Sequence, residues 1–252
     1  MNISRLAKET YNTIALSYHQ MRTVNRTSGW FYNEYLEMPT TLKMLGNTKG
    51  KKVLDLGCGT GLYTRILKRM GAKVKAIDIS KNMVEIARKE VPNAEFKVGS
   101  ATKLPYKNEF FDIVVSPLMI EYLSILQWNK ALKEVHRVLK KGGYFIFSTG
   151  NPIVETLRKI RYRKRIFREI SDYFGEGQRI SKWIFPDGST TTLRYHHKTY
   201  TTIIRSIIKN KFEIVDYEDA KPVKSAKKYF PKEYKKYSSK PFFCTWKIKK
   251  KS

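Results

Sequence analysis

The sequence has 252 residues, of which 41% are hydrophobic and 13% aromatic, so one full hydrophobic core is expected. Its 50 lysines and arginines outnumber 22 acidic residues, which gives a net charge of +28, and more than half of this excess follows residue 150. No segment is apolar enough to span a membrane, and the two cysteines, Cys58 and Cys244, support neither a disulfide framework nor a zinc site. Because the N-terminus also lacks the apolar core of a secretory signal, we expect a cytoplasmic protein without a metal.

Hydrophobic periodicity indicates that helices and strands alternate along the first 150 residues. The expected helices lie at residues 3–21, 31–46, 61–70, 81–90 and 127–139, with Ser80 as the N-cap of the fourth. The expected strands lie at residues 51–56, 73–77, 95–98, 111–116 and 144–149. This alternation predicts an α/β fold with a Rossmann-like, mostly parallel sheet and helices on both faces.

The character of the sequence changes after Asn151 and Pro152. Residues 153–170 are very basic, and we expect a helix there. A hairpin is expected at 182–195, with its turn at Pro186-Asp187-Gly188. A helix at 199–209 and strands at 211–217 and 241–248 complete a seven-stranded sheet. We therefore divide the chain into an N-terminal helical cap (1–48), a sheet core (49–150), an α+β insertion after the fifth strand (151–198), and the last helix and strands (199–252).

Three glycines at alternate positions follow the first strand, in the segment VLDLGCGTG that ends at Gly61. An open parallel sheet binds ligands at the carboxyl ends of its strands, where glycine permits a sharp turn and a close approach of the backbone. The spacing G-x-G-x-G differs from the dinucleotide fingerprint G-x-G-x-x-G. Asp55, two residues before the first glycine, suits a cationic ligand better than a pyrophosphate. Asp78 ends the second strand, where a carboxylate is placed to accept the two hydroxyls of a ribose.

Four segments, in order, resemble the motifs of class I S-adenosylmethionine-dependent methyltransferases. They are DLGCGTG, AIDISKNMVEIAR, VGSATKLPYKNEFFDIVVS and VHRVLKKGGYFIFST, and the resemblance covers residues 53–149. Within this family, the chain is most similar to the small-molecule enzymes typified by those of ubiquinone and menaquinone biosynthesis. The resemblance implies that the core binds S-adenosylmethionine and that the protein transfers its methyl group.

The same resemblance assigns roles to individual residues. It implies that Asp55 organises the glycine loop and the ammonium group of the cofactor, and that Asp78 binds the ribose diol. The family often has aspartate where Ser100 stands, so the contact with the adenine amino group is expected to be weaker or shifted. Residues expected along the methionine and ribose are Gly57, Cys58, Gly59 and Gly61. Residues expected around the adenine and the transferable methyl are Ile79, Met83, Ala101, Leu104, Pro117 and Leu118.

Two further segments resemble parts of this branch that contact the acceptor. Tyr11, Ala15 and Tyr18 match a Y-D-x-x-A-x-x-Y helix in which the second tyrosine reaches the cofactor carboxylate or the acceptor. His197 matches a histidine before the last helix and is the candidate general base, together with Tyr18 at the catalytic site. An interpretation without function is also open for both segments. The tyrosines would then be packing residues of an amphipathic helix, and the histidine would belong to a pair on the surface.

The chemistry expected is an in-line displacement, which needs a base only where the nucleophile carries a proton at neutral pH. The leading interpretation is methyl transfer to the oxygen or carbon of a small or lipid-like acceptor. The residues from Ser116 to Met119 lack the signature of amino-methylating DNA enzymes, so no DNA specificity is expected. A tRNA or rRNA methyltransferase and a catalytically silent cofactor-binding module are the alternatives.

The basic segment 158–168, RKIRYRKRIFR, is the most charged part of the insertion. As an amphipathic helix it would suit an anionic membrane surface. It would equally follow an RNA backbone. A solvated lid helix is the third interpretation, and the sequence leaves all three open.

Overall fold

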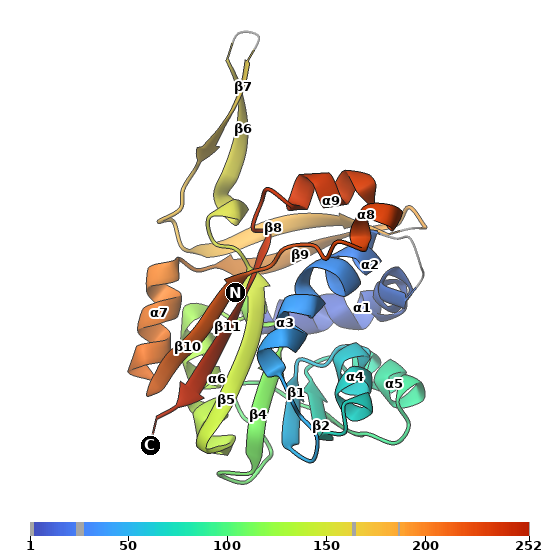
Figure 1. Cartoon of the computed structure of the whole chain (residues 1–252), viewed down its shortest axis with the longest axis vertical. Coiled ribbons are helices and arrows are strands. Elements are labelled where there is room, and N and C mark those ends of the chain that lie inside the picture. Colours follow the sequence, from blue (N-terminus) through green and yellow to red (C-terminus); the bar gives the residue numbers. More distant parts are fainter. Residues whose placement is uncertain (1–2, 24–27, 163–164, 186, 252) are drawn as a thin grey trace.

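The computed structural model describes residues 3–23, 28–162, 165–185 and 187–251 (Figure 1). The strands of its central sheet are β1 (Lys52–Leu56), β2 (Lys73–Asp78), β3 (Glu95–Val98), β4 (Phe111–Ser116), β5 (Leu139–Gly150), β10 (Phe212–Asp219) and β11 (Phe243–Lys250). They lie in the order β10-β11-β5-β4-β1-β2-β3. Neighbours are parallel except at β11, which is antiparallel to β5 and β10. The fold class predicted from the sequence is confirmed.

Helices cover both faces of this sheet, because its central strands are apolar on both sides. One face packs Val53 and Ile146 against α3 and α4, and Ala76 against α5. The other face packs Phe145 against Trp128 of α6 and is also covered by α7. The carboxyl ends of β1, β2 and β4 are left for the site. The helices are α3 (Met38–Leu45), α4 (Leu62–Arg69), α5 (Lys81–Glu90), α6 (Ile125–Val138) and α7 (Tyr200–Lys209).

The N-terminal cap lies over the end of the sheet that carries the glycine loop (Figure 1). It consists of α1 (Ile3–Thr23), α2 (Ser28–Trp30), the π-helix η1 (Phe31–Glu37) and α3. Asn12 joins α1 to the start of α5. Its side-chain oxygen accepts from the Ser80 hydroxyl at 2.7 Å, and its backbone oxygen accepts from the side-chain amide of Asn82 at 2.8 Å. Ser80 is also the N-cap of α5, as the sequence predicts, and its hydroxyl accepts from the Met83 amide.

The insertion contains two hairpins, and the helix expected at 153–170 is wrong. After the short 3-10 helix η3 (Val154–Thr156), β6 (Leu157–Tyr162) pairs with β7 (Arg165–Ile170) and projects from the body (Figure 1). The segment IRYRKRIF spaces β-branched and aromatic residues among the charges, a composition that favours strands. The side chains of 159–169, which carry most of the basic segment, lie outside the described residues. The second hairpin, β8 (Gly177–Ile184) with β9 (Thr190–His197), forms where predicted.

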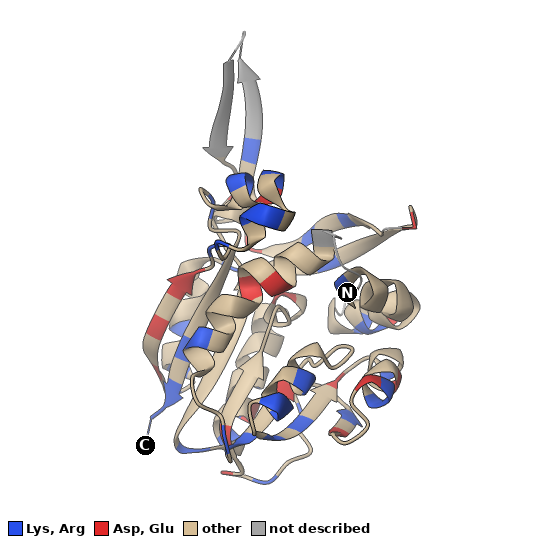
Figure 2. Cartoon of the chain, turned by 45° about the vertical axis from the view of Figure 1, so that its right-hand side comes forward, with Lys and Arg blue, Asp and Glu red and all other residues tan. Residues whose placement is uncertain are grey.

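The connection between β10 and β11 folds back over the N-terminal cap. Its helices α8 (Ala226–Tyr229) and α9 (Pro231–Tyr237) bring Phe230 and Tyr237 against Phe31 of η1. At the edge of the sheet, β10 carries four acidic residues, which Figure 2 shows gathered on that strand. Charges on an edge strand oppose pairing with another chain. Within the described residues, every helix is too short or too polar to cross a bilayer.

Candidate functional site

The glycine loop after β1 forms the floor of a pocket at the carboxyl end of the sheet. Gly57, Gly59 and Gly61 all have positive φ angles, of 78°, 52° and 86°. The Gly57 amide donates to the Ile77 carbonyl at 2.8 Å, and a Cβ at Gly57 would clash with the side chain of Met119. In front of Gly59 there is open space within 4 Å, because Gly59 faces the pocket. Glycine is therefore needed here for backbone conformation and for access.

Asp55 is a buried carboxylate with one free oxygen. Its Oδ2 accepts from the Thr64 hydroxyl at 2.6 Å, whereas Oδ1 is buried without a hydrogen-bond partner among the described residues. Burial, with a smaller contribution from Asp78, raises the pKa of Asp55 to about 7. An unsatisfied carboxylate oxygen in a pocket wall fits a cationic group of a ligand, because such a partner would offset the cost of burying the charge.

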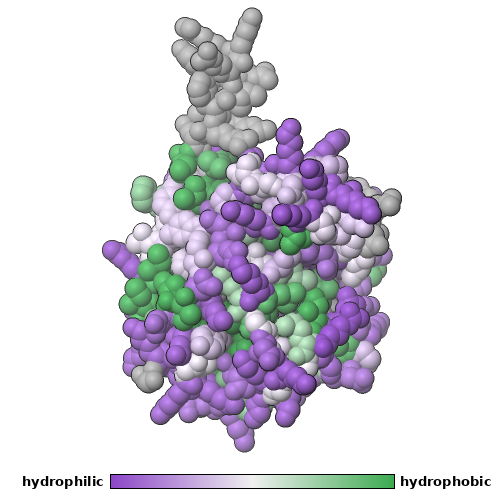
Figure 3. Space-filling view, viewed as in Figure 1, coloured by the Kyte–Doolittle hydropathy of each residue, from purple (hydrophilic) through white to green (hydrophobic). Residues whose placement is uncertain are grey.

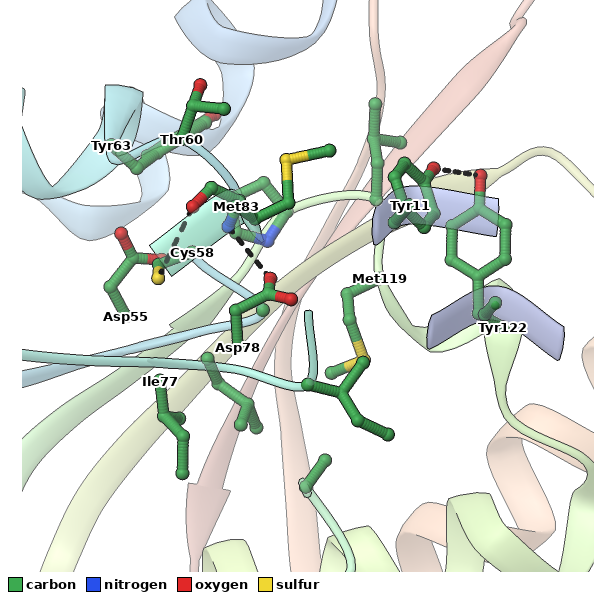
Figure 4. A pocket seen from close by; sticks show the side chains of 18 of the residues that line it. Tyr11, Asp55, Cys58, Thr60, Tyr63, Ile77, Asp78, Met83, Met119 and Tyr122 are labelled. Atoms are coloured by element: carbon green, nitrogen blue, oxygen red, sulfur yellow. Dashed lines mark hydrogen bonds between the residues drawn. The ribbon is translucent and has the colours of Figure 1, made fainter. Parts of the chain in front are cut away.

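Asp78 joins the two loops that surround the pocket. Its Oδ2 accepts from the Gly59 amide at 2.9 Å, and its Oδ1 accepts from the Ser80 amide at 2.8 Å. Figure 4 shows this carboxylate turned toward the backbone of the glycine loop. Burial raises the pKa of Asp78, and the backbone hydrogen bonds oppose that rise. Each oxygen of an ionised carboxylate can accept a second hydrogen bond, so the group remains suited to a diol.

The pocket wall brings together most of the residues that the family resemblance singled out. Two expected residues lie outside this wall. Gly61 begins α4, where a Cβ would stand 3.2 Å from Ala87 of α5, and Leu104 is buried in the main core. Ser100 lines the pocket, and its hydroxyl lies 2.9 Å from that of Thr102. The expected residues that line it are Tyr11, Tyr18, Asp55, Gly57, Cys58, Gly59, Asp78, Ile79, Met83, Ser100, Ala101, Pro117 and Leu118.

A second cavity, of about 540 Å³, opens beside the first. Its walls come from α1, η1, the β8–β9 hairpin and the loops after β4 and β5. Both cavities share Tyr11, Tyr18, Arg22, Leu118 and Tyr122, so these residues form the boundary between them. The aromatic side chains of the second cavity are Tyr11, Tyr18, Tyr32, Tyr122, Trp183, Tyr195, Phe242 and Phe243.

The boundary is a connected group of tyrosines with one half-buried arginine. Tyr18 accepts a hydrogen bond from Arg22, stacks on Trp183 with ring centroids 6.1 Å apart, and meets the edge of Tyr11. Arg22 also donates to Asn33 of η1. The sequence interpretation missed Arg22, although it follows Tyr18 by four positions and therefore shares its face of α1.

His197 does not reach either cavity. Its side chain is fully buried, its Nδ1 lies 2.9 Å from Glu155 Oε2, and its Nε2 donates to the Tyr173 carbonyl at 2.9 Å. Burial opposes the charged imidazolium, but these two hydrogen bonds outweigh burial and raise the pKa of His197. Glu155 lines the second cavity, so the histidine stands behind a carboxylate. The structure therefore does not bring His197 together with Tyr18 as a general base.

Glu37 is a buried residue that the sequence interpretation did not single out. Its carboxylate accepts from three hydroxyls: Thr41 at 2.7 Å, Tyr63 at 2.8 Å and Ser148 at 2.6 Å. Burial raises its pKa, and the hydrogen bonds limit that rise. These contacts join the π-helix η1 to α4 and β5. Glu37 thereby holds the cap against the sheet beside the pocket, and π-helical turns occur frequently at functional sites.

Comparisons with known proteins identify the family to which this fold belongs. A family model described as a methyltransferase domain matches residues 54–147. An uncharacterized protein of Haemophilus influenzae is 30% identical over 83% of this chain and 85% of its own length. A demethylmenaquinone methyltransferase of Lactococcus lactis is 29% identical over 73% of this chain and 77% of its own length. An S-adenosylmethionine-dependent methyltransferase from Mesorhizobium loti has a solved structure with a TM-score of 0.72, 27% identity, and coverage of 84% of this chain and 96% of that one.

The fold and the pocket are those of a Rossmann-like nucleotide-cofactor enzyme. The chain belongs to the class I S-adenosylmethionine-dependent methyltransferases, and S-adenosylmethionine is its cofactor. The lining of the pocket is compatible with this cofactor: Asp55, with its unpaired Oδ1, would hold the ammonium group, Asp78 the ribose hydroxyls, and Ile79 and Met83 the adenine. The bound cofactor supplies a methyl group already activated on a sulfonium. The protein's task is therefore to align the acceptor and to exclude water.

Proposed function

We propose that the acceptor is a small molecule with an aromatic ring, methylated at oxygen or carbon. The observation that carries this proposal is the second cavity, whose aromatic walls meet the cofactor pocket at Tyr11, Tyr18 and Tyr122. Aromatic side chains favour flat, apolar ligands, and polar groups at a few positions orient them. The cavity supplies such groups from Arg22 and Glu121.

Two of the similar proteins support this acceptor class to different degrees. The demethylmenaquinone methyltransferase of Lactococcus lactis is similar along 73% of this chain and 77% of its own length. A malonyl-[acyl-carrier protein] O-methyltransferase of Serratia marcescens is 33% identical, but over only 43% of this chain and 42% of its own length. An aromatic acceptor of the first kind is therefore better supported than an acyl thioester.

Transfer of labelled methyl from S-adenosylmethionine tests the proposal. The purified protein is offered a naphthohydroquinone, a malonyl thioester and bulk tRNA in separate reactions. We expect label on the naphthohydroquinone, with Asp78→Ala as the control that removes cofactor binding. Label on tRNA or on the thioester, with none on the aromatic compound, would contradict the proposed acceptor class.

We further propose a cytoplasmic protein that attaches to an anionic membrane surface. On the outer face of β8, Ile180 and Ile184 are 61% and 68% exposed, and Ile184 also lines the acceptor cavity. Phe174, before β8, is 86% exposed, and Figure 3 shows hydrophobic residues near the base of the projecting hairpin. Exposed apolar residues on a chain of net charge +28 suit anionic lipid. The free thiols of Cys58 and Cys244 support a reducing compartment.

A further inference from the structure

Two carboxylates meet in the acceptor cavity, on the side formed by the end of β5. Glu121 comes from the 3-10 helix η2 (Ile120–Tyr122), and Glu155 comes from η3. Gly150 lies against both, because its amide donates to Glu121 Oε2 at 3.2 Å and a Cβ there would clash with Glu155 Oε1. Glu121 is next to Tyr122, whose ring borders the cofactor pocket. A carboxylate is thus held at the cavity wall beside the boundary.

The surroundings of Glu121 have opposing effects on the pKa of its carboxyl group. Glu121 accepts long hydrogen bonds from the Thr149 hydroxyl at 3.4 Å and from the Gly150 amide, and the hydroxyl of Tyr122 is a further polar neighbour. Lys198 is buried behind η2, where its ammonium donates to the Ile120 and His196 carbonyls at 3.1 Å each. Burial, then Glu155, raises the pKa of Glu121 to about 7, against the effects of the Gly150 amide, Lys198 and Thr149. Burial lowers the pKa of Lys198 to about 8.

The two carboxylates differ in their hydrogen-bond partners. One oxygen of Glu155 is bonded to His197, which is itself held by Tyr173. The three tyrosine hydroxyls at the boundary each take part in a hydrogen bond, since Tyr11 donates to Tyr122 and Tyr18 accepts from Arg22, and neutral phenols are poor bases. Arg22 and Lys182, the cationic residues among the described lining, are unsuited to remove a proton from a ligand. Glu121 is therefore the carboxylate of this wall that is not bonded to a histidine, and its pKa lies near neutral pH.

We propose that Glu121 is the general base for acceptors that carry a proton, an inference that rests on the aromatic acceptor proposed above. The acceptor's O–H or C–H proton passes to a Glu121 oxygen as the acceptor atom forms its bond to the methyl carbon. The bond from that carbon to sulfur breaks, and its electron pair stays on sulfur. Charge is balanced, because the sulfonium and the carboxylate are both neutralised. Glu155 and His197 are positioning residues that hold a negative charge beside Glu121.

The test compares two acceptors that differ in whether a proton must be removed. At pH 8, 1-naphthol is largely protonated, whereas 4-nitro-1-naphthol is already ionised. For Glu121→Gln we expect kcat on 1-naphthol to fall by about 10²- to 10⁴-fold, the usual contribution of a general base. On the nitro compound, wild type and variant should turn over at similar rates. Glu109→Gln, at the opposite end of the sheet, is the matched control and should leave both rates unchanged.

A carbon-13 titration of the glutamate carboxyls gives a second measurement that needs no acceptor. We expect Glu121 to titrate near neutral pH, and Glu155→Gln to move that midpoint downward because it removes a neighbouring negative charge. Equal losses on both naphthols, or none, would overturn the proposal, as would a Glu121 already ionised at pH 5. If wild type methylates neither naphthol, the aromatic acceptor is wrong, and the titration still decides whether Glu121 has the properties of a base.

Discussion

The hydroxyl of Tyr11 donates a hydrogen bond of 2.8 Å to the hydroxyl of Tyr122, and the two rings meet edge to face with centroids 5.3 Å apart. The pair joins α1 to the turn after β4 and borders both cavities (Figure 4). If the acceptor binds in the second cavity, as proposed, the methyl group crosses this boundary during transfer. The N-terminal helix would then contribute directly to the reaction chamber, although it lies outside the segments that carry the cofactor motifs.

This relationship predicts a graded response at Tyr11. Tyr11→Phe loses one hydrogen bond, worth about 1 kcal/mol, but keeps the ring that closes the boundary. Tyr11→Ala also loses the ring, so water enters and the acceptor is no longer aligned. We expect kcat to change by a few-fold in the first variant and much more in the second. Steady-state kinetics on the naphthohydroquinone measures both, and equal rates for Tyr11→Ala and wild type would count against the boundary.

The ribose contact predicts unequal effects at two polar residues of the cofactor pocket. Asp78→Ala removes a carboxylate placed for charge-assisted hydrogen bonds, each worth about 1.5–3 kcal/mol, whereas the Ser100 hydroxyl already pairs with Thr102. The affinity for S-adenosylhomocysteine should therefore fall more than about tenfold in Asp78→Ala and little in Ser100→Ala.

Calorimetry measures both affinities. Because Asp78 also accepts from the Gly59 and Ser80 amides, the melting temperature of each variant is the control for folding. A folded Asp78→Ala protein with wild-type affinity would rule out the ribose role.

Asp55 predicts that cofactor affinity depends on pH. Its pKa is raised to about 7 in the free protein, so the carboxyl is protonated at lower pH and must lose that proton to face an ammonium group. Affinity for S-adenosylmethionine should then weaken as pH falls from 7 to 5.5, by up to about tenfold per pH unit. Asp55→Asn should bind weakly at every pH and lose this slope. A slope that persists in the variant would belong to another group, such as Asp78.

The exposed face of the second hairpin predicts attachment to lipid. Ile184→Ser should weaken binding to vesicles that contain anionic phospholipid, because it removes an apolar side chain from the surface proposed to face the membrane. Leu126→Ser is the matched control, since Leu126 is 77% exposed but lies on α6, outside the insertion. Sedimentation with vesicles measures the effect. Salt-sensitive binding to tRNA that ignores Ile184 would favour RNA as the partner of the positive charge.

The core of the site was predictable because its signals are local. A strand, three glycines and an aspartate follow one another at Val53–Gly61, and the backbone angles that require glycine are set within the same turn. Asp78 ends the neighbouring strand, so the parallel register brings it to the loop. The sheet order then follows from ordinary α/β connections.

The remainder depends on contacts that no local pattern reveals. His197 was expected at the acceptor because of its place before α7, but Glu155 and Tyr173, far away in the sequence, occupy both of its nitrogens. Glu121 carries no motif, and only its burial beside Glu155 distinguishes it from a surface glutamate. In the basic segment, charged residues separate the β-branched and aromatic residues that favour strands, and the chain forms a hairpin where a helix is expected from the sequence.

The hydrogen bonds of Asn12, which hold α1 against the start of α5, bear on the rate of turnover. Side chains of α1 cover the cofactor pocket, and Asn12 secures that helix to the residues that begin α5. We expect the spent cofactor to leave when these hydrogen bonds open, and the proposed acceptor to enter beneath the β8–β9 hairpin, which lines the second cavity. Exchange of the cofactor and of the acceptor would then be controlled by separate movements. We expect the lifting of α1, rather than the chemical step, to limit the steady-state rate once both substrates are saturating.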